Sequence, residues 1–325
     1  MSRQRITPIQ LFFLTLLYVY SGLSLSGADS LFALLVPFAA TALWALVGMR
    51  GAGKHRDGLR GFLSAYMRRE EAVLPHLFFL TVSAAQAVCQ LFDTAEVLVR
   101  EADFLSFASV VAVVLAASIV LCRLGMTALG RLSETVLLLL IPLVFLHAFG
   151  GYTPMDAFGV QADVHLLFSV LPAPVFFLLS LTVTAGDAEA TDSLLASSRV
   201  PRDRARLLCG VVIGGAALAV VLRAFLLILP LGEHELLARF LEYISYVVKL
   251  ALLLSLCTQG TAGLAMGART VGAGLMALAV VIAVASLGGA LYSPGALLTV
   301  LVSASAAAAL VLALFSIRPP KGNLP

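Results

Sequence analysis

The sequence predicts an all-α integral membrane protein, with ten transmembrane helices in a five-plus-five inverted repeat and discontinuous helices 1 and 6. Three observations lead to this fold class: apolar stretches of spanning length, basic residues on alternate loops, and helix-weakening residues in the first span of each half. Hydrophobic residues make up 61% of the chain and charged residues 12%. A water-soluble domain has about 25% charged residues, so the composition excludes one.

Ten apolar stretches are long enough to cross a bilayer, which takes about 20 mostly apolar residues. No segment between them is long enough for a soluble domain, so we expect a single membrane domain over residues 1–325. The predicted spans are 8–28, 30–49, 72–92, 104–122, 132–150, 164–184, 207–230, 243–263, 271–291 and 294–317.

Basic residues gather in the loops on one side of the membrane. They occupy both terminal tails and the loops after spans 2, 4, 6 and 8, whereas the opposite loops carry only Arg100 and Arg239. Because cytoplasmic loops are rich in Lys and Arg, we expect both termini in the cytoplasm. A cleaved signal peptide ending at Ser26–Ala28 is the alternative for span 1. Its apolar run exceeds the usual core of about 7–15 residues and leads directly into another span.

The ten spans divide into two sets of five, roughly residues 1–150 and 151–325. Because five is odd, the second set starts on the opposite side of the membrane, as an inverted repeat requires. In such transporters the first helix of each half is broken near the bilayer midplane. Glycine, serine and proline in Tyr20–Ser24 of span 1 and Ser169–Pro174 of span 6 predict such breaks. We expect the two breaks to lie side by side and to line a cavity.

Two cations lie inside spans, Arg223 in span 7 and Lys249 in span 8. A charge at the bilayer centre costs about 2.5–3.5 kcal/mol on insertion scales, so both should face the protein interior or reach the interface. Lys249 shares a helical face with Glu242 and Tyr246. It either lines a ligand cavity, replaces a coupling cation, pairs with Glu242 or extends to the interface.

Other candidate residues are less specific. Arg223 is expected to pair with Glu233 or Glu235 at the outer end of its span, and Gln86 is a buried hydrogen-bonding group for a ligand. The chain has neither a phosphate-binding Gly-x4-Gly-Lys-Ser/Thr loop nor a His-Glu-x-x-His motif, so we expect no enzyme and no cofactor. The cysteines lack metal-ligand spacing and are interpreted as buried thiols without disulfides: Cys89, Cys122, Cys209 and Cys257.

Two short segments resemble the spore germination permease family, which supplies the B subunits of germinant receptors in endospore-forming bacteria. Arg5–Phe12 (RITPIQLF) is similar to the start of that family, where a basic residue, Ile-Ser or Ile-Thr, two residues and Gln lead into helix 1. Gly125–Glu134 (GMTALGRLSE) is similar to its Gly-x5-Arg-x-x-Glu motif before helix 5. Tyr20–Gly27 (YSGLSLSG) departs from the Gly-Ser-Gly-like break of many relatives.

The resemblance implies the fold of the amino acid–polyamine–cation transporter superfamily. It also implies a small germinant such as an amino acid as ligand, A-type and C-type receptor subunits as partners, and the spore inner membrane as location. The ligand would lie between helices 1 and 6, with an amino acid carboxylate at the backbone donors of the helix 1 break. The expected ligand-binding residues are Tyr20, Ser21, Gly22, Ser24, Gln86, Ser169, Pro172, Tyr246 and Lys249.

A stand-alone amino acid permease, coupled to a cation or to protons, would use the same fold and the same site, because fold does not determine function. A membrane scaffold without a ligand is a third alternative. Neighbouring genes for an A-type subunit and a lipoprotein would favour the receptor. Uptake of labelled amino acid into vesicles would favour the permease, and the lack of a central cavity would favour the scaffold.

Overall fold

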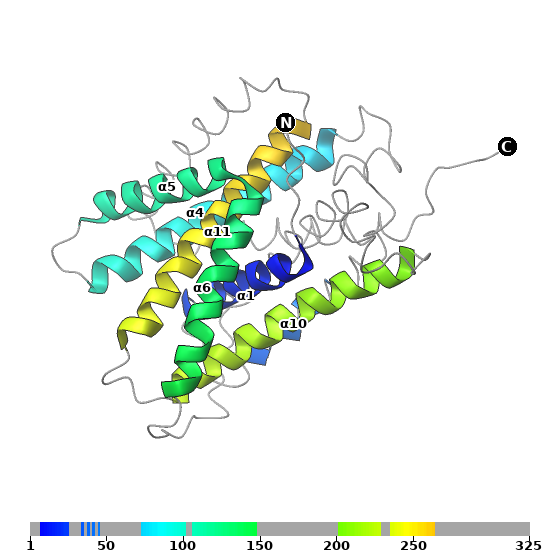
Figure 1. Cartoon of the computed structure of the whole chain (residues 1–325). Helices are drawn as coiled ribbons and strands as arrows, with labels where there is room; N and C mark the ends of the chain where they lie inside the picture. The colour runs from blue at the N-terminus through cyan, green and yellow to red at the C-terminus, as the bar shows by residue number, and fades with distance from the viewer. Residues whose placement is uncertain are drawn as a thin grey trace.

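The computed structural model describes residues 7–25, 34–35, 38–39, 41–42, 45, 73–101, 106–147, 201–228 and 235–263 (Figure 1). Apart from the cap residues Thr7, Ser106 and Gly125, all of these residues are helical. The helices are α1 Pro8–Leu25, α4 Val73–Glu101, α5 Phe107–Leu124, α6 Met126–His147, α10 Pro201–Ile228 and α11 Glu235–Gly263. Stretches long and apolar enough to cross a membrane occur in three of them: Pro8–Leu25, Phe107–Leu124 and Cys209–Leu226.

The predicted helical membrane class is therefore confirmed in its coarse form. Helices occur where spans 1, 3, 4, 5, 7 and 8 were predicted. The spans predicted at 164–184, 271–291 and 294–317 lie outside the described residues, as does most of the span at 30–49. The ten-span inverted repeat accordingly stays a prediction.

The start of α1 is fixed by a capping box. The Thr7 hydroxyl accepts a hydrogen bond from the Gln10 backbone nitrogen, and the Gln10 side chain accepts one from the Thr7 backbone nitrogen, both at 3.2 Å. Pro8 takes the first helical position, where its missing N–H group is not needed. Part of the segment that resembles the start of germination permeases is therefore a helix-start signal.

A single glycine separates α5 from α6. Ser106 caps the start of α5 by accepting a hydrogen bond from the Ser109 backbone nitrogen at 3.2 Å. At the other end Gly125 has a φ of 90° and donates its N–H to the Cys122 carbonyl, a conformation that disfavours any residue with a side chain. α6 begins at once at Met126, earlier than the span predicted at 132–150.

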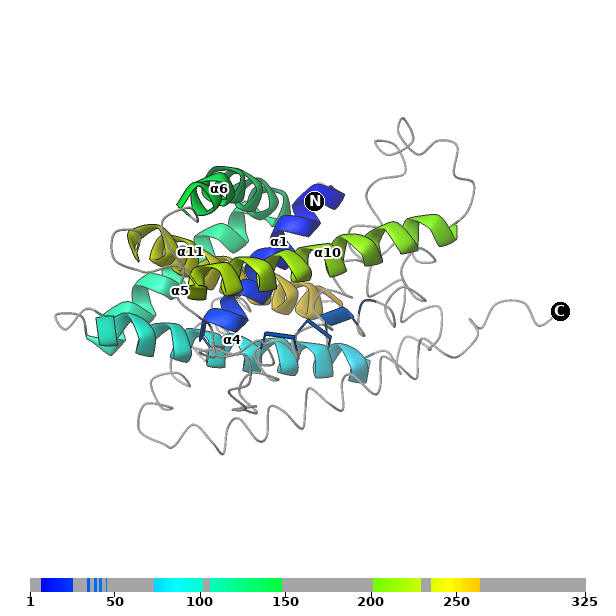
Figure 2. The same ribbon diagram turned by 90° about the horizontal axis from the view of Figure 1, so that it is seen from below.

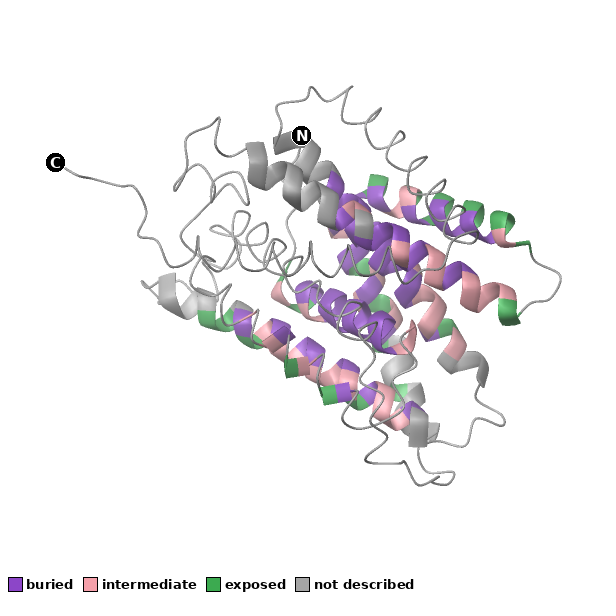
Figure 3. Ribbon diagram, turned by 180° about the vertical axis from the view of Figure 1, so that it is seen from behind, coloured by how far each residue is buried: buried purple, intermediate pink, exposed green. Residues whose placement is uncertain are grey.

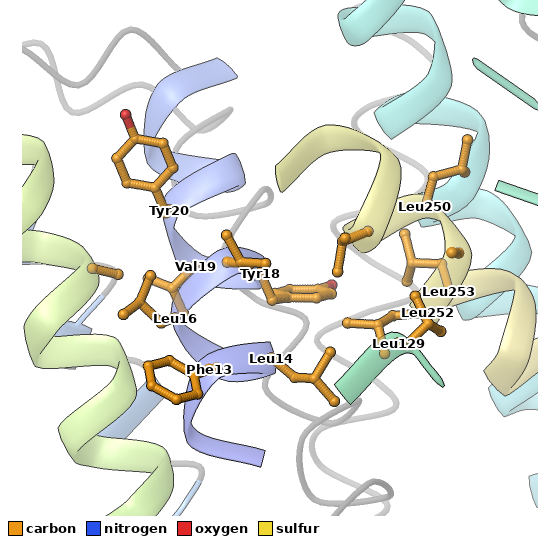
Figure 4. Packing of buried hydrophobic residues seen from close by; sticks show 14 of the residues in the cluster. Phe13, Leu14, Leu16, Tyr18, Val19, Tyr20, Leu129, Leu250, Leu252 and Leu253 are labelled. Carbon is orange, nitrogen blue, oxygen red and sulfur yellow. The ribbon is translucent and has the colours of Figure 1, made fainter. Parts of the chain in front are cut away.

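α1 is the central helix of the described part. In its apolar stretch 72% of the residues are buried inside the protein, compared with 33% in the stretches of α5 and α10. α10, α11, α6 and α4 pack around α1, as Figure 2 shows, whereas exposed residues line the outward sides of α5 and α10 (Figure 3). Tyr18 and Tyr20 leave α1 in opposite directions, Tyr18 toward the leucines of α11 (Figure 4). Most sides of α1 therefore contact protein rather than lipid.

Contacts along α1 show that α10 runs parallel to it. Phe12, near the start of α1, lies against Gly214 in the middle of α10. Tyr20, two turns farther along α1, interacts with Arg223, which lies correspondingly farther along α10. This parallel arrangement is the one expected for spans 1 and 7 of a chain that crosses the membrane alternately.

α11 runs antiparallel to both α1 and α4. Ser24 at the end of α1 bonds to Tyr246 near the start of α11, whereas the earlier Tyr18 lies beneath Lys249, farther along α11. Glu101, the last residue of α4, contacts the first turns of α11. These directions agree with the predicted topology, in which the odd-numbered spans 1 and 3 cross the membrane in one direction and the even-numbered span 8 crosses it in the other.

The predicted discontinuity of helix 1 at Ser21–Ser24 is wrong, because α1 remains helical to Leu25. The segment contains no proline, and one glycine costs a helix interior only about 1 kcal/mol. The serine side chains bond to other helices instead of competing for their own backbone. Backbone N–H groups used within the helix are also not free to bind a ligand carboxylate. The matching segment Ser169–Pro174 lies outside the described residues.

Two glycines of α10 should respond in opposite ways to the same substitution. A Cβ at Gly215 would lie 2.7 Å from the Phe12 carbonyl oxygen, so Gly215→Ala must push α1 and α10 apart. We expect it to lower the free energy of unfolding by about 1–3 kcal/mol. At Gly210 nothing lies within 4 Å of an added Cβ, so Gly210→Ala should stabilise the helix by about 0.5–1 kcal/mol. Thermal unfolding in detergent measures both variants, and equal melting temperatures would contradict the close packing of α1 on α10.

Candidate functional site

Polar side chains of α1, α4, α10 and α11 meet toward the end of the bundle where α1, α4 and α10 finish and α11 begins. Most of the predicted ligand-binding residues are on these helices, whereas Ser169 and Pro172 lie outside the described residues. The described ones are Tyr20, Ser21, Gly22 and Ser24 on α1, Gln86 on α4, and Tyr246 and Lys249 on α11.

Glu242 connects α11 to two other helices. Its Oε1 accepts hydrogen bonds from the Ser24 hydroxyl at 2.7 Å and from Arg223 Nη1 at 3.0 Å. The Ser24 hydroxyl also lies 2.8 Å from the Tyr246 hydroxyl. The side chains of Arg223 and Glu242 are 13% and 17% exposed. Their ion pair is therefore poorly screened by solvent, and the attraction is stronger than in a surface pair.

The ion-pair partners differ from those predicted. Glu242, expected as an alternative partner of Lys249, binds Arg223 instead. The reason is the arrangement of the helices. α10 places the Arg223 guanidinium beside Glu242, whereas Lys249 lies about two turns after Glu242 along α11. The side chains of Glu233 and Glu235, the predicted partners of Arg223, lie outside the described part of the chain.

Lys249 is held between α1 and α4. It is 4% exposed, and its Nζ lies 5.0 Å from the centroid of the Tyr18 ring, which is a cation–π distance. The carboxylate of Asp93 on α4 also acts on it electrostatically. The lysine therefore faces the protein interior, as the cost of burying its charge in a membrane predicts.

Two glutamines on one face of α4 differ in their bonding. Gln90 donates to the Ser21 hydroxyl at 3.1 Å and to the Thr94 hydroxyl at 3.3 Å. Gln86, one turn earlier, is 6% exposed, and within the described part of the chain neither its amide nitrogen nor its amide oxygen has a hydrogen-bond partner. Buried polar groups are nearly always bonded. The Gln86 amide therefore has the capacity to bind a ligand or water.

The predicted α1 residues do not all face the same neighbours. Ser24 lies with Tyr246, and Ser21 lies with α4. Tyr20 is fully buried but interacts with Arg223, on the opposite side of α1 from Tyr18 and therefore from Lys249 (Figure 4). Gly22 is buried within α1. The other described residues thus form one cluster toward α4 and α11, while Tyr20 lies on the side of α10 and is also acted on by Glu242 and Tyr246 of α11.

Several residues of this cluster were missing from the predicted list. They are Tyr18, Gln90, Asp93, Arg223 and Glu242. A signal for the α4 residues was present, because Gln86, Gln90 and Thr94 recur every fourth residue on one helical face. Nothing in the sequence distinguished Tyr18 from the other aromatic residues of span 1.

No protein-family model matches the chain, and no curated protein matches it. The two segments that resemble germination permeases nevertheless meet in the structure. A Cβ at Gly130 would lie 2.9 Å from the Gln10 side chain, so the start of α1 packs closely on the start of α6. The resemblance therefore covers two parts of one packed unit.

Proposed function

We propose that this chain is a ligand-binding membrane subunit of a spore germinant receptor, which binds a small germinant such as an amino acid within its helix bundle. The observation that carries this proposal is the buried Gln86 amide, which has no hydrogen-bond partner among the described residues. An unsatisfied buried polar group destabilises a protein by about 1–3 kcal/mol. A scaffold gains nothing from such a group, whereas a binding protein uses it when the ligand arrives.

The assignment to germinant receptors is supported by the resemblance of Arg5–Phe12 and Gly125–Glu134 to germination permeases. On this proposal the chain lies in the spore inner membrane with both termini in the cytoplasm, in the ten-span inverted-repeat fold. The antiparallel and parallel directions of the described helices are compatible with that topology. A-type and C-type receptor subunits are the proposed partners.

Ligand binding would act through the packing of α1. The ligand would contact Gln86 of α4 and the region of Lys249. Tyr18 of α1 lies against Lys249, and Ser21 of α1 is bonded to Gln90, one turn from Gln86. Any shift of α1 there changes its contacts with α10 and α11. A ligand with different affinities for the shifted and unshifted arrangements of α1 changes their populations. The partner subunits would respond to that change.

A thermal-shift screen of amino acids, sugars and nucleosides on the purified protein tests the proposal. A ligand that binds the folded state alone raises the melting temperature by mass action. Lys249→Met should express and fold normally, because methionine has a similar length and Asp93 is only half-buried. It should lose the ligand-induced shift. A Lys249→Met protein with an unchanged shift would remove Lys249 from the site, and a screen without any shift would refute ligand binding.

A stand-alone amino acid permease coupled to a cation or to protons is the second candidate. Lys249, a buried positive charge between α1 and α4, fits the place of a coupling cation as well as that of a ligand contact. Uptake of labelled amino acid by the purified protein in vesicles separates the two. Uptake without any partner subunit would favour the permease.

A further inference from the structure

Where α11 begins, the positive and negative charges of the described side chains balance. Each described cation there is paired with a carboxylate or acted on by one, and the pair of Arg223 with Glu242 is largely buried. Ion pairs join Arg100 to Glu96, Arg239 to Glu101 and Arg223 to Glu242, and the Asp93 carboxylate acts electrostatically on Lys249. The described part of this region is therefore electrically neutral before any ligand binds.

The packing of α4 against α11 independently places Asp93 and Lys249 at a similar height along the bundle. Tyr243 of α11 donates a hydrogen bond to Glu101, the last residue of α4. A helix rises 1.5 Å per residue. Asp93 therefore precedes Glu101 by about 12 Å along α4. Lys249 follows Tyr243 by about 9 Å along α11. Because the two helices are antiparallel, Asp93 and Lys249 stand within about 3 Å of the same height.

On the side of α1 that faces α4, the neutral amide of Gln86 has open hydrogen-bonding capacity. Both polar atoms of the Gln86 amide are buried without a hydrogen-bond partner among the described residues, as are the Tyr20 hydroxyl and Arg223 Nε on the side of α10. The Gln86 amide is suited to a ligand group that accepts one hydrogen bond and donates another. The neighbouring Gln90 is already bonded to Ser21 and Thr94. Recognition at Gln86 is thus by neutral hydrogen bonds rather than by an ion pair.

We propose that the site selects ligands without net charge, either zwitterions or uncharged polar molecules, that both accept and donate a hydrogen bond at Gln86. The proposal rests on the proposed function, since it specifies the ligand class of the same site. A ligand with an extra charge would bring a buried charge without a counter-charge, and unpaired buried charges are strongly unfavourable. Amino acids with charged side chains, polyamines and dicarboxylates are therefore excluded.

Matched pairs of probes test this selectivity on the purified full-length protein in detergent. Asparagine with aspartate, glutamine with glutamate, and norleucine with lysine each have similar size but differ by one charge. A hexose and a purine nucleoside complete the panel as uncharged probes. We expect at least one neutral probe to bind and its charged counterpart to bind about 100-fold more weakly or not at all.

The outcomes separate this inference from the proposed function. A charged probe that binds as tightly as its neutral counterpart would overturn the charge selectivity and leave ligand binding intact. If no probe in the whole panel raises the melting temperature or binds in calorimetry, the proposed function fails, and the inference fails with it. Binding of the hexose or the nucleoside alone would support the selectivity, because these probes are neutral.

A charge variant adds a second test. Asp93→Asn keeps the shape of the side chain but leaves Lys249 without its carboxylate, so the region gains a net positive charge. The affinity ratio of aspartate to asparagine should rise by about tenfold or more. Glu96→Gln is the matched control, because its pair with Arg100 is exposed at 44% and 74%, and the ratio should not change. An unchanged ratio in Asp93→Asn would overturn the charge-balance argument.

Discussion

Replacing Gln86 with methionine is expected to stabilise the ligand-free protein and at the same time to abolish its response to ligand. The amide nitrogen and oxygen are buried without a hydrogen-bond partner among the described residues. Methionine fills a similar volume with no polar group to desolvate. The free energy of unfolding should therefore rise by about 1–3 kcal/mol. Thermal unfolding with and without the best ligand measures both effects.

Gln90→Met is the matched control, one turn away on the same face of α4. Gln90 bonds to Ser21 and Thr94, so its loss leaves a buried hydroxyl unsatisfied and should destabilise the protein by about 1–3 kcal/mol. If Gln86→Met raises the free energy of unfolding and Gln90→Met lowers it, Gln86 is available to a ligand and Gln90 is structural. A Gln86→Met protein that melts earlier than the wild type would show that the amide is bonded within the chain.

The second large effect is expected at the ion pair between α10 and α11. Glu242→Ala leaves the Arg223 guanidinium largely buried without its carboxylate, and it also removes the acceptor of Ser24. Breaking a buried pair from one side costs about 3–5 kcal/mol. The double variant Arg223→Met/Glu242→Met should be clearly more stable than Glu242→Ala, because no unpaired charge remains.

Chemical or thermal unfolding of the single and double variants in detergent checks this expectation. Glu96→Ala provides the surface reference, since its pair with Arg100 joins neighbouring turns of α4 and is exposed. It should cost about 0–1 kcal/mol. If Glu242→Ala is no more damaging than Glu96→Ala, the pair of Arg223 with Glu242 does not connect the two helices in the way the structure indicates.

The sequence predicted which segments of the described chain are helical, because apolar length and helix signals such as Thr7 with Gln10 are local properties. It also predicted the polar face of α11, since Glu242, Tyr246 and Lys249 follow the helical period. All of these depend on residues within one or two turns of each other.

The pairing of side chains between helices was not predictable in the same way. Glu242 was one expected partner of Lys249, because both lie on one face of α11, but its ion-pair partner comes from α10. Likewise, Gln86 and Gln90 share a face, yet only Gln90 stands at the level of Ser21. Such contacts depend on which helices are neighbours and on their relative height, which no local pattern contains. The break in helix 1 was inferred from composition alone, and one glycine does not suffice to break a helix.

The position of α1 at the centre of the bundle has a consequence for biosynthesis. It is the first described helix to be made, yet Ser24 bonds to residues 218 and 222 positions farther along the chain. At about 5–20 residues per second, translation needs roughly 10–40 s to supply those partners. During that interval the Ser24 hydroxyl lacks its partners Glu242 and Tyr246 of α11. The interior of the bundle therefore closes late in synthesis, and a chain truncated before α10 would leave α1 without its contacts to α10 and α11.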